Sequence, residues 1–150
     1  MDVTLALCLP RDHLSVPLAR HILKSSLTAI GYDRDDISDV ELALTEASTN
    51  VLDHANGDDE YEIKVRLSGT TISIEVVDTG HGFDGSAHGL LDADPGAEEG
   101  RGVQLMRALV DRLEFQSRPT EGTVVHLEKR LRLPADSPVA KLVKADDSPR

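Results

Sequence analysis

The stretch Glu41-Leu-Ala-Leu-Thr-Glu-Ala-Ser-Thr-Asn-Val-Leu-Asp-His54 decides the fold, because it predicts one continuous helix with two different faces. Glu46, Asn50 and His54 are spaced by four residues and line up along one of them. That polar face is either a solvated surface or the edge of a functional site, and the helix alone does not separate these interpretations. Apolar residues mark the neighbouring face at the spacing of a packed amphipathic helix: Ile37, Val40, Leu44, Ala47 and Val51.

Composition limits the classes of function. The 150 residues indicate one domain with a substantial core, which must be aliphatic because aromatic residues make up only 3%. The net charge of −11 argues against direct binding of nucleic acid and against binding to an anionic membrane surface. A protein partner with a basic surface is more compatible with this charge.

The single cysteine, Cys8, excludes an internal disulfide and a cysteine-based zinc site. It lies in a short apolar run, so we expect a small buried hydrophobic residue and not a nucleophile. No stretch has the apolar length of a transmembrane helix, and the N-terminus lacks the features of a signal peptide. We therefore expect a cytoplasmic protein.

The first half of the chain predicts a strand, two helices and a hairpin. Alternation from Val3 to Leu9 indicates a half-buried strand that ends at Pro10, and Ser15 is expected to cap a helix that stops at Gly31. The expected elements that follow are a helix from Asp35 or Asp36 to about Ala55, and strands 61–67 and 72–76 joined by a Ser68-Gly69 turn.

The second half predicts a long loop, a helix and another hairpin. Residues 85–100 are rich in Gly, Ala, Asp and Glu, and a loop of this length suggests a lid or a binding loop. A short helix is expected from Val103 to Leu113, then strands from Glu114 and from Thr123 around a turn at 118–122. The expected domain is 1–133, followed by a mobile tail at 134–150. The order predicts an α+β sandwich, with helices on one face of a mixed, mostly antiparallel sheet.

Two glycine pairs flank the predicted loop. Gly80-x-Gly82 follows a strand and permits close backbone approach, whereas Gly100-x-Gly102 precedes a helix whose free N–H groups suit phosphates. Each pair alone is equally explained by a simple turn, since neither fits a phosphate-loop or dinucleotide pattern.

Four polar side chains near these turns could bind a nucleotide or act on it. Asp78 ends the strand before the first pair and has a carboxylate that can accept a hydrogen bond from an exocyclic amine such as that of adenine, although Asp is also common in turns. Asn50 has an amide oxygen of the kind that Mg²⁺ accepts beside phosphates, and Arg101 is well placed to assist with them. Glu46, one turn away, is able to orient or deprotonate an attacking hydroxyl or water.

In combination and in order, these segments resemble the boxes of the GHKL ATPases, a class that includes histidine kinases, DNA gyrase and MutL and that has the Bergerat fold. The resemblance rests on Glu46-x-x-x-Asn50, Asp78-x-Gly80-x-Gly82, Gly100-x-Gly102 and Gly122-Thr123, and it covers roughly residues 1–132. The short chain and the segment from Thr45 to His54 look most like the bacterial anti-sigma-factor serine kinases.

The resemblance implies a role for each residue. Asn50 would ligate Mg²⁺, Glu46 would be the general base or a water-orienting acid, and Asp78 would bind the adenine amine with Thr123 close to it. Gly80 and Gly82 would let the backbone pass the nucleotide, and residues 85–100 would form the ATP lid. The phosphates would meet Gly100, Arg101, Gly102 and Val103. No role follows for His54, or for His81 between the first two glycines.

The function that this resemblance implies is an ATP- and Mg²⁺-dependent serine/threonine-protein kinase that also binds and blocks a sigma factor. Its phosphorylation substrate would be a small anti-anti-sigma antagonist of the STAS type, and a homodimer is expected. The alternative is a binding module that sequesters a partner and holds ATP without transferring phosphate. A histidine-kinase fragment is disfavoured, since we find no helical hairpin with a phosphoacceptor histidine, and a gyrase-like role is disfavoured by the charge.

Overall fold

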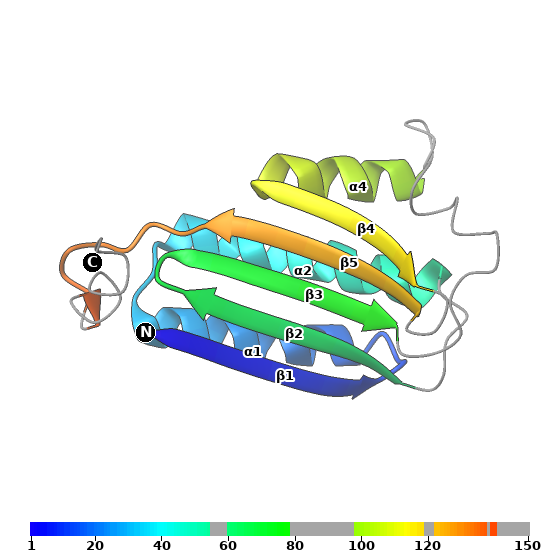
Figure 1. Cartoon of the computed structure of the whole chain (residues 1–150), viewed down its shortest axis with the longest axis horizontal. Coiled ribbons are helices and arrows are strands. Elements are labelled where there is room, and N and C mark those ends of the chain that lie inside the picture. The colour runs from blue at the N-terminus through cyan, green and yellow to red at the C-terminus, as the bar shows by residue number, and fades with distance from the viewer. Residues whose placement is uncertain (55–59, 79–97, 119–121, 138, 141–150) are drawn as a thin grey trace.

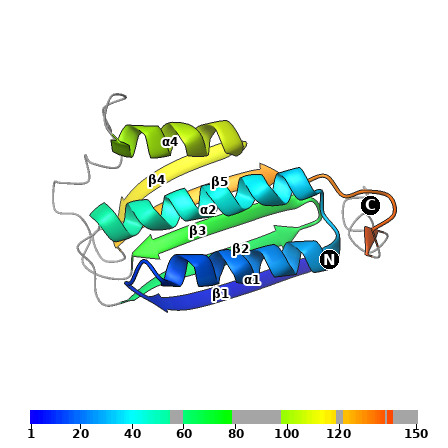
Figure 2. The same ribbon diagram turned by 180° about the vertical axis from the view of Figure 1, so that it is seen from behind.

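The chain forms two layers, with the helices on one face of a five-stranded sheet (Figures 1 and 2). The structure is a computed structural model that describes residues 1–54, 60–78, 98–118, 122–137 and 139–140. This is the predicted α+β sandwich. The elements in chain order are β1 (Asp2–Pro10), α1 (Ser15–Ile30), α2 (Arg34–His54), β2 (Glu60–Ser68), β3 (Thr71–Asp78), α4 (Glu98–Leu109), β4 (Arg112–Arg118) and β5 (Gly122–Arg130).

The strand order is β1-β2-β3-β5-β4, and each of these neighbouring pairs is antiparallel, where a mixed, mostly antiparallel sheet was predicted. Short connections join β2 to β3 and β4 to β5, which favours antiparallel pairing. The register aligns one apolar residue from each strand in a row across the sheet: Leu5, Val65, Ile74, Leu127 and Leu113. Alternation along each strand directs such rows toward the helices and leaves the other face polar.

The core is aliphatic, as the composition predicts, but Cys8 is not part of it. Among the largest fully buried side chains, Tyr61 is the one aromatic residue. Cys8 is exposed, because β1 is an edge strand whose odd-numbered residues face the helices and whose even-numbered residues face away. None of the helices in the described ranges combines the length and apolar character needed to cross a membrane.

Helix α1 begins at Ser15 as predicted, but Ser15 does not cap it. No side chain caps this terminus; the carboxylate of Asp12 accepts a hydrogen bond from the backbone N–H of Leu14, and the Ser15 hydroxyl is buried. At the other end, Gly31 adopts a left-handed conformation with φ of 99° and its N–H bonds to the Leu27 carbonyl. This is the helix stop that the sequence predicts.

Helix α2 is capped by Asp33, and not opened by Asp35 or Asp36 as predicted. One carboxylate oxygen of Asp33 accepts hydrogen bonds from the backbone N–H groups of Asp35 and Asp36, each at 3.1 Å. An Asp immediately before Arg34 therefore fills the N-cap position. The side chain of Asp36 is thereby free to turn toward the sheet.

The remaining boundaries differ from the predictions by a few residues. Ser68 pairs with Thr71, so the hairpin turn is Gly69-Thr70, with φ of 60° at the glycine, one residue later than predicted. Helix α4 begins at Glu98 and ends at Leu109, so Leu113 belongs to β4, which starts at Arg112. The residues of the predicted turn between β4 and β5 lie partly outside the described ranges.

Part of the segment that was expected to be a mobile tail is packed. The Ser137 hydroxyl donates a hydrogen bond of 2.6 Å to the carbonyl of Ile30 at the end of α1, and Ala140 is buried. Leu133, the last residue of the expected domain, packs against the core. Residues 141–150 lie outside the described ranges.

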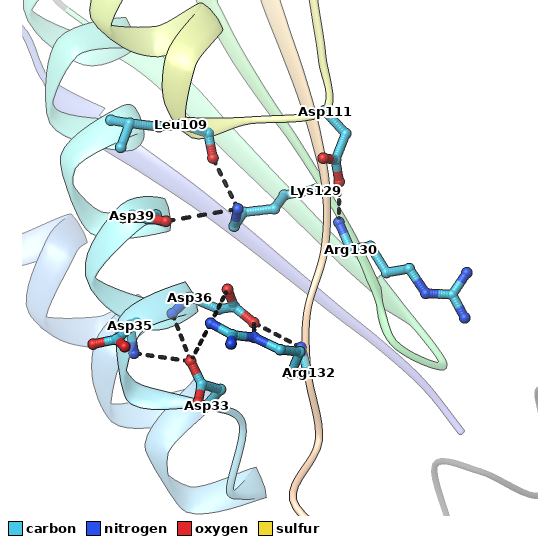
Figure 3. A network of polar contacts seen from close by, with 9 residues as sticks. All are labelled: Asp33, Asp35, Asp36, Asp39, Leu109, Asp111, Lys129, Arg130 and Arg132. Carbon is cyan, nitrogen blue, oxygen red and sulfur yellow. Dashed lines mark hydrogen bonds and ion pairs between the residues drawn. The ribbon is translucent and has the colours of Figure 1, made fainter.

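A network of charges joins the start of α2 to the end of β5 (Figure 3). Asp36 is buried and accepts hydrogen bonds from both the backbone and the guanidinium of Arg132, which also reaches Asp33 at 2.9 Å. Burial raises the pKa of Asp36, but the hydrogen bonds and positive charge of Arg132, with a contribution from Lys129, outweigh burial and hold the pKa below its usual value.

This network predicts how stability depends on pH. The ordinary aspartate pKa is 3.8. Because folding lowers it, the ionised Asp36 stabilises the fold at all pH values above the unfolded-state pKa. That stabilisation is lost as the pH falls through the folded-state pKa. We expect Asp36→Asn to lower the free energy of unfolding at pH 7, and the difference from the wild type to shrink as the pH falls below the ordinary aspartate pKa of 3.8.

Urea unfolding followed by circular dichroism, at pH 7 and at about pH 3, measures this difference in the free energy of unfolding. Asp35→Asn is the matched control, since it removes an exposed carboxylate from the same helical turn. A deficit of Asp36→Asn that is as large at pH 3 as at pH 7 would contradict the assignment.

Candidate active site

The two faces of α2 are arranged as the spacing predicts. Its apolar stripe is buried against the sheet, and Asn50 on the neighbouring face is also buried, with 6% exposure. Glu46 lies one turn earlier and is half-buried. Burial of the stripe fixes the rotation of the helix, so both polar side chains point toward α4 and not toward bulk solvent.

Gly102 of α4 lies directly against these two side chains. A Cβ atom at this position would be 2.9 Å from Glu46 Oε2 and 3.9 Å from Asn50 Oδ1. The first distance is shorter than carbon and oxygen atoms tolerate, so the missing side chain lets the carboxylate approach the backbone of α4. The structure thus brings together Glu46, Asn50 and Gly102, which are predicted site residues from distant parts of the chain.

The second glycine pair was predicted to precede a helix, but it lies inside α4. Gly100, Arg101 and Gly102 occupy the first two turns of the helix, which begins at Glu98. Two glutamates at the start of the segment favour this earlier start, because acidic residues suit the positive end of the helix dipole. Arg101 is exposed, and Val103 packs against the hydrophobic core. This packing supports the site, and the contact of Val103 with phosphate stays a prediction.

Asp78 is the last residue of β3, and Thr123 lies at the start of the neighbouring strand β5, at the same end of the sheet. Val77 pairs with Val124, so Asp78 and Thr123 occupy the next position of the β3–β5 register. Both are buried, with 1% and 3% exposure. A carboxylate and a hydroxyl therefore lie together at the end of the sheet where α2 also ends.

A residue that the sequence analysis missed, Arg11, joins this group. Its Nη1 lies 3.3 Å from Asp78 Oδ1, and its Nη2 donates to the carbonyl oxygens of Leu52 at 3.2 Å and Val51 at 3.4 Å. The signal available in the sequence was weak, since it consisted of one basic residue directly after the strand-ending Pro10.

A buried hydrogen bond lies beside this arginine. The hydroxyls of Ser15 and Tyr61 are 2.6 Å apart, and Tyr61 is the cross-strand partner of Asp78. Burial raises the pKa of Tyr61, and the Ser15 hydrogen bond and the nearby charge of Arg11 offset only part of this rise. Tyr61 is therefore a neutral hydroxyl at physiological pH, and it fixes the start of α1 to the sheet.

Several predicted residues lie outside the described ranges: Gly80, Gly82, His81 and the predicted lid up to residue 97. His54 is the last residue of α2, and the structure does not describe its side chain. Asp53 is exposed and lies 3.2 Å from His13, also exposed, so it belongs to the surface.

The described residues suit a nucleotide with its metal ion. Asn50 Nδ2 and Thr123 Oγ1 are buried without a hydrogen-bond partner among the described residues, and buried polar groups normally have one. No described group of three or more His, Cys, Asp or Glu residues suits a metal ion. An ion here would therefore need ligand oxygens beyond those of Asn50, as Mg²⁺ bound to phosphates has.

A cavity of about 520 Å³ lies at the opposite end of the molecule, near the start of α2. Asp36 in its lining is paired with Arg132, and Asp111 accepts a hydrogen bond from the backbone N–H of Arg130 (Figure 3). None of the predicted site residues within the described ranges lines this cavity.

Comparison with known proteins agrees with this arrangement. Residues 9–129 match the family model of the histidine kinase-like ATPase domain. The serine-protein kinase RsbW of Bacillus velezensis is 31% identical in an alignment of 134 positions that covers 82% of each chain. The anti-sigma F factor of Thermoanaerobacter sp. is 32% identical, over 74% of this chain and 82% of that protein.

Among solved structures, the RsbU and RsbW domains of Rv1364c from Mycobacterium tuberculosis align over 89% of this chain with a TM-score of 0.66 and 21% identity. The alignment covers 35% of that longer chain and shows a shared fold. Together, the family match over most of the sequence and the curated relatives show that this chain belongs to the histidine kinase-like ATPase domain family.

Proposed function

We propose that this protein is an ATP- and Mg²⁺-dependent serine/threonine-protein kinase that also binds and blocks a sigma factor. The observation that carries the proposal is the junction of α2 and α4, where the Glu46 carboxylate and the Asn50 amide meet the backbone of Gly102. Relatives named as a serine-protein kinase and as an anti-sigma factor support both halves of the proposal.

The proposed partners are a sigma factor and a small anti-anti-sigma antagonist of the STAS type, in the cytoplasm and with a homodimer as the acting form. The net charge of −11 supports protein partners with basic surfaces over direct contact with nucleic acid or an anionic membrane.

Each residue of the site has a proposed role. Asp78 accepts a hydrogen bond from the adenine amine, with Thr123 beside it. Asn50 holds Mg²⁺ through its amide oxygen, and Gly102 lets the phosphates approach. Arg101, which is exposed, is free to turn toward them. The remaining proposed contacts are the backbone of Gly80, Gly82 and Gly100.

The bound nucleotide and metal supply a transferable γ-phosphoryl group and neutralise its charge. Glu46 accepts the proton of the substrate serine or threonine hydroxyl as the hydroxyl oxygen bonds to the γ-phosphorus. The bond from that phosphorus to the bridging oxygen breaks, and ADP leaves. The position of Glu46 on a helix fixed by core packing supports this role, because a general base must be held within reach of the proton that it removes.

Glu46→Gln tests whether the protein transfers phosphate. We expect transfer from ATP to a STAS-type antagonist to fall by about 100-fold or more, because the amide cannot accept the proton. ATP affinity, measured by calorimetry, should change by less than about threefold. Glu41→Gln is the control, since it changes a half-buried glutamate of the same helix that lines a different groove. A wild-type protein that blocks its sigma factor but transfers no phosphate would support the binding module instead.

Asn50→Ala tests the metal ligand. Loss of a contact to a charged ligand should weaken Mg²⁺-dependent ATP binding by about 10- to 100-fold. Without Mg²⁺, the two proteins should bind ATP about equally. The neighbouring half-buried Thr49 points about 100° away around the helix, so Thr49→Ala should leave binding unchanged. Equal Mg²⁺ dependence in Asn50→Ala and wild type would exclude the role.

Gly102→Ala tests the junction itself. The new Cβ displaces the flexible end of Glu46, and alanine favours a helix, so stability should stay within about 1 kcal/mol of the wild type. The transfer rate should fall by about 100-fold, as a displacement of about 1 Å can do to a catalytic group. Gln104→Ala changes an exposed residue of the same helix and is the control. Transfer at the wild-type rate would contradict the proposed role of Gly102.

A further inference from the structure

The side chain of Arg11 connects the end of β3 with the end of α2. It follows the last residue of β1, and its side chain is 14% exposed. One terminal nitrogen faces the Asp78 carboxylate, and the other donates to the last turn of α2, at Val51 and Leu52. Val51 directly follows Asn50, so a single guanidinium touches both the proposed adenine acceptor and the helix turn that carries the proposed metal ligand.

The burial of Asp78 explains why a cation is needed there. Its side chain is 1% exposed, and a buried carboxylate is costly unless it is paired. The guanidinium is planar and its donors point in fixed directions, so the two carbonyl contacts determine the orientation of the group. The orientation of the guanidinium in turn limits the rotation of the Asp78 carboxylate.

We propose that Arg11 is a positioning residue for adenine recognition, which pairs with the Asp78 carboxylate and holds it turned toward the 6-amino group of the base. The inference rests on the proposed ATP binding and goes beyond it, since it assigns base specificity to a residue outside the motifs. Arg11 acts through Asp78 and does not itself contact the nucleotide.

The experiment compares the affinities for ATP and inosine triphosphate, which carries an oxygen in place of the 6-amino group. Calorimetry with Mg²⁺ on the full chain gives the ratio of the two dissociation constants. We expect Arg11→Gln to reduce the preference for ATP by at least about tenfold, because a neutral amide leaves the carboxylate unpaired. Arg11→Lys retains the charge but loses the planar group that contacts both carbonyls, so its preference for ATP should lie between those of Arg11→Gln and the wild type.

The matched control is Arg20→Gln. Arg20 is also half-buried and reaches α2 from α1, where its Nη1 lies 3.5 Å from Thr45 Oγ1, in the middle of α2 and not at the end that Arg11 contacts. The Arg20→Gln substitution should leave the preference for ATP over inosine triphosphate unchanged. A similar loss of preference in Arg20→Gln would mean that any weakened contact to α2 has this effect, which would overturn the specific role of Arg11.

A double-mutant cycle separates positioning from general support. If Arg11 acts through Asp78, then the double variant Arg11→Gln with Asp78→Asn should discriminate between ATP and inosine triphosphate no worse than Asp78→Asn alone. Additive effects on ATP affinity, or an unchanged preference in Arg11→Gln, would overturn the inference. If Arg11→Gln does not fold, the double variant, which removes both charges, and Arg11→Lys still provide the comparison. A wild-type protein that binds neither nucleotide would refute the proposed function itself.

Discussion

Burial of the apolar stripe of α2 against the sheet is the constraint on which the rest of the structure depends. With Val40, Leu44, Ala47 and Val51 almost fully buried, the helix cannot rotate without exposing the core. The direction of Glu46 and Asn50 follows from this, because they lie about one-third of a turn away from the stripe. The site is therefore positioned by core packing, and the absence of a side chain at residue 102 lets α4 close over it.

A different arginine holds each end of α2, and the charges found at each end suit the helix dipole there. At the N-terminus, Arg132 pairs with Asp33 and Asp36, whose negative charges suit the positive end of the helix dipole. At the C-terminus, Arg11 bonds to the last carbonyl groups. Lys129 meets the end of α4 in the same way, at the carbonyl of Leu109 (Figure 3). These cations lie far in sequence from the groups that they hold and connect the helix ends to the sheet.

Periodicity made the two long helices, the strands and the polar face of α2 predictable, because local spacing alone determines them. The end of α4 was misjudged because Leu113 continues the helical spacing although it belongs to the next strand. The prediction that Cys8 is buried was wrong, because the side of a strand that faces the core depends on the strand's place in the sheet, which the sequence does not state. Arg11 was missed for a related reason: its pairing with Asp78 spans 67 positions and depends on the tertiary fold.

The exposed position of Cys8 has a practical consequence. It is the only cysteine of the chain, so a thiol-reactive fluorophore would label the natural sequence at a single atom. The label would sit on the open face of the sheet, away from the helices, and should leave the core intact. Cys8 pairs with Glu62, next to the row that runs from Leu9 through Tyr61 to Asp78. The protein thus carries a built-in reporter position close to the end of the sheet where the site lies.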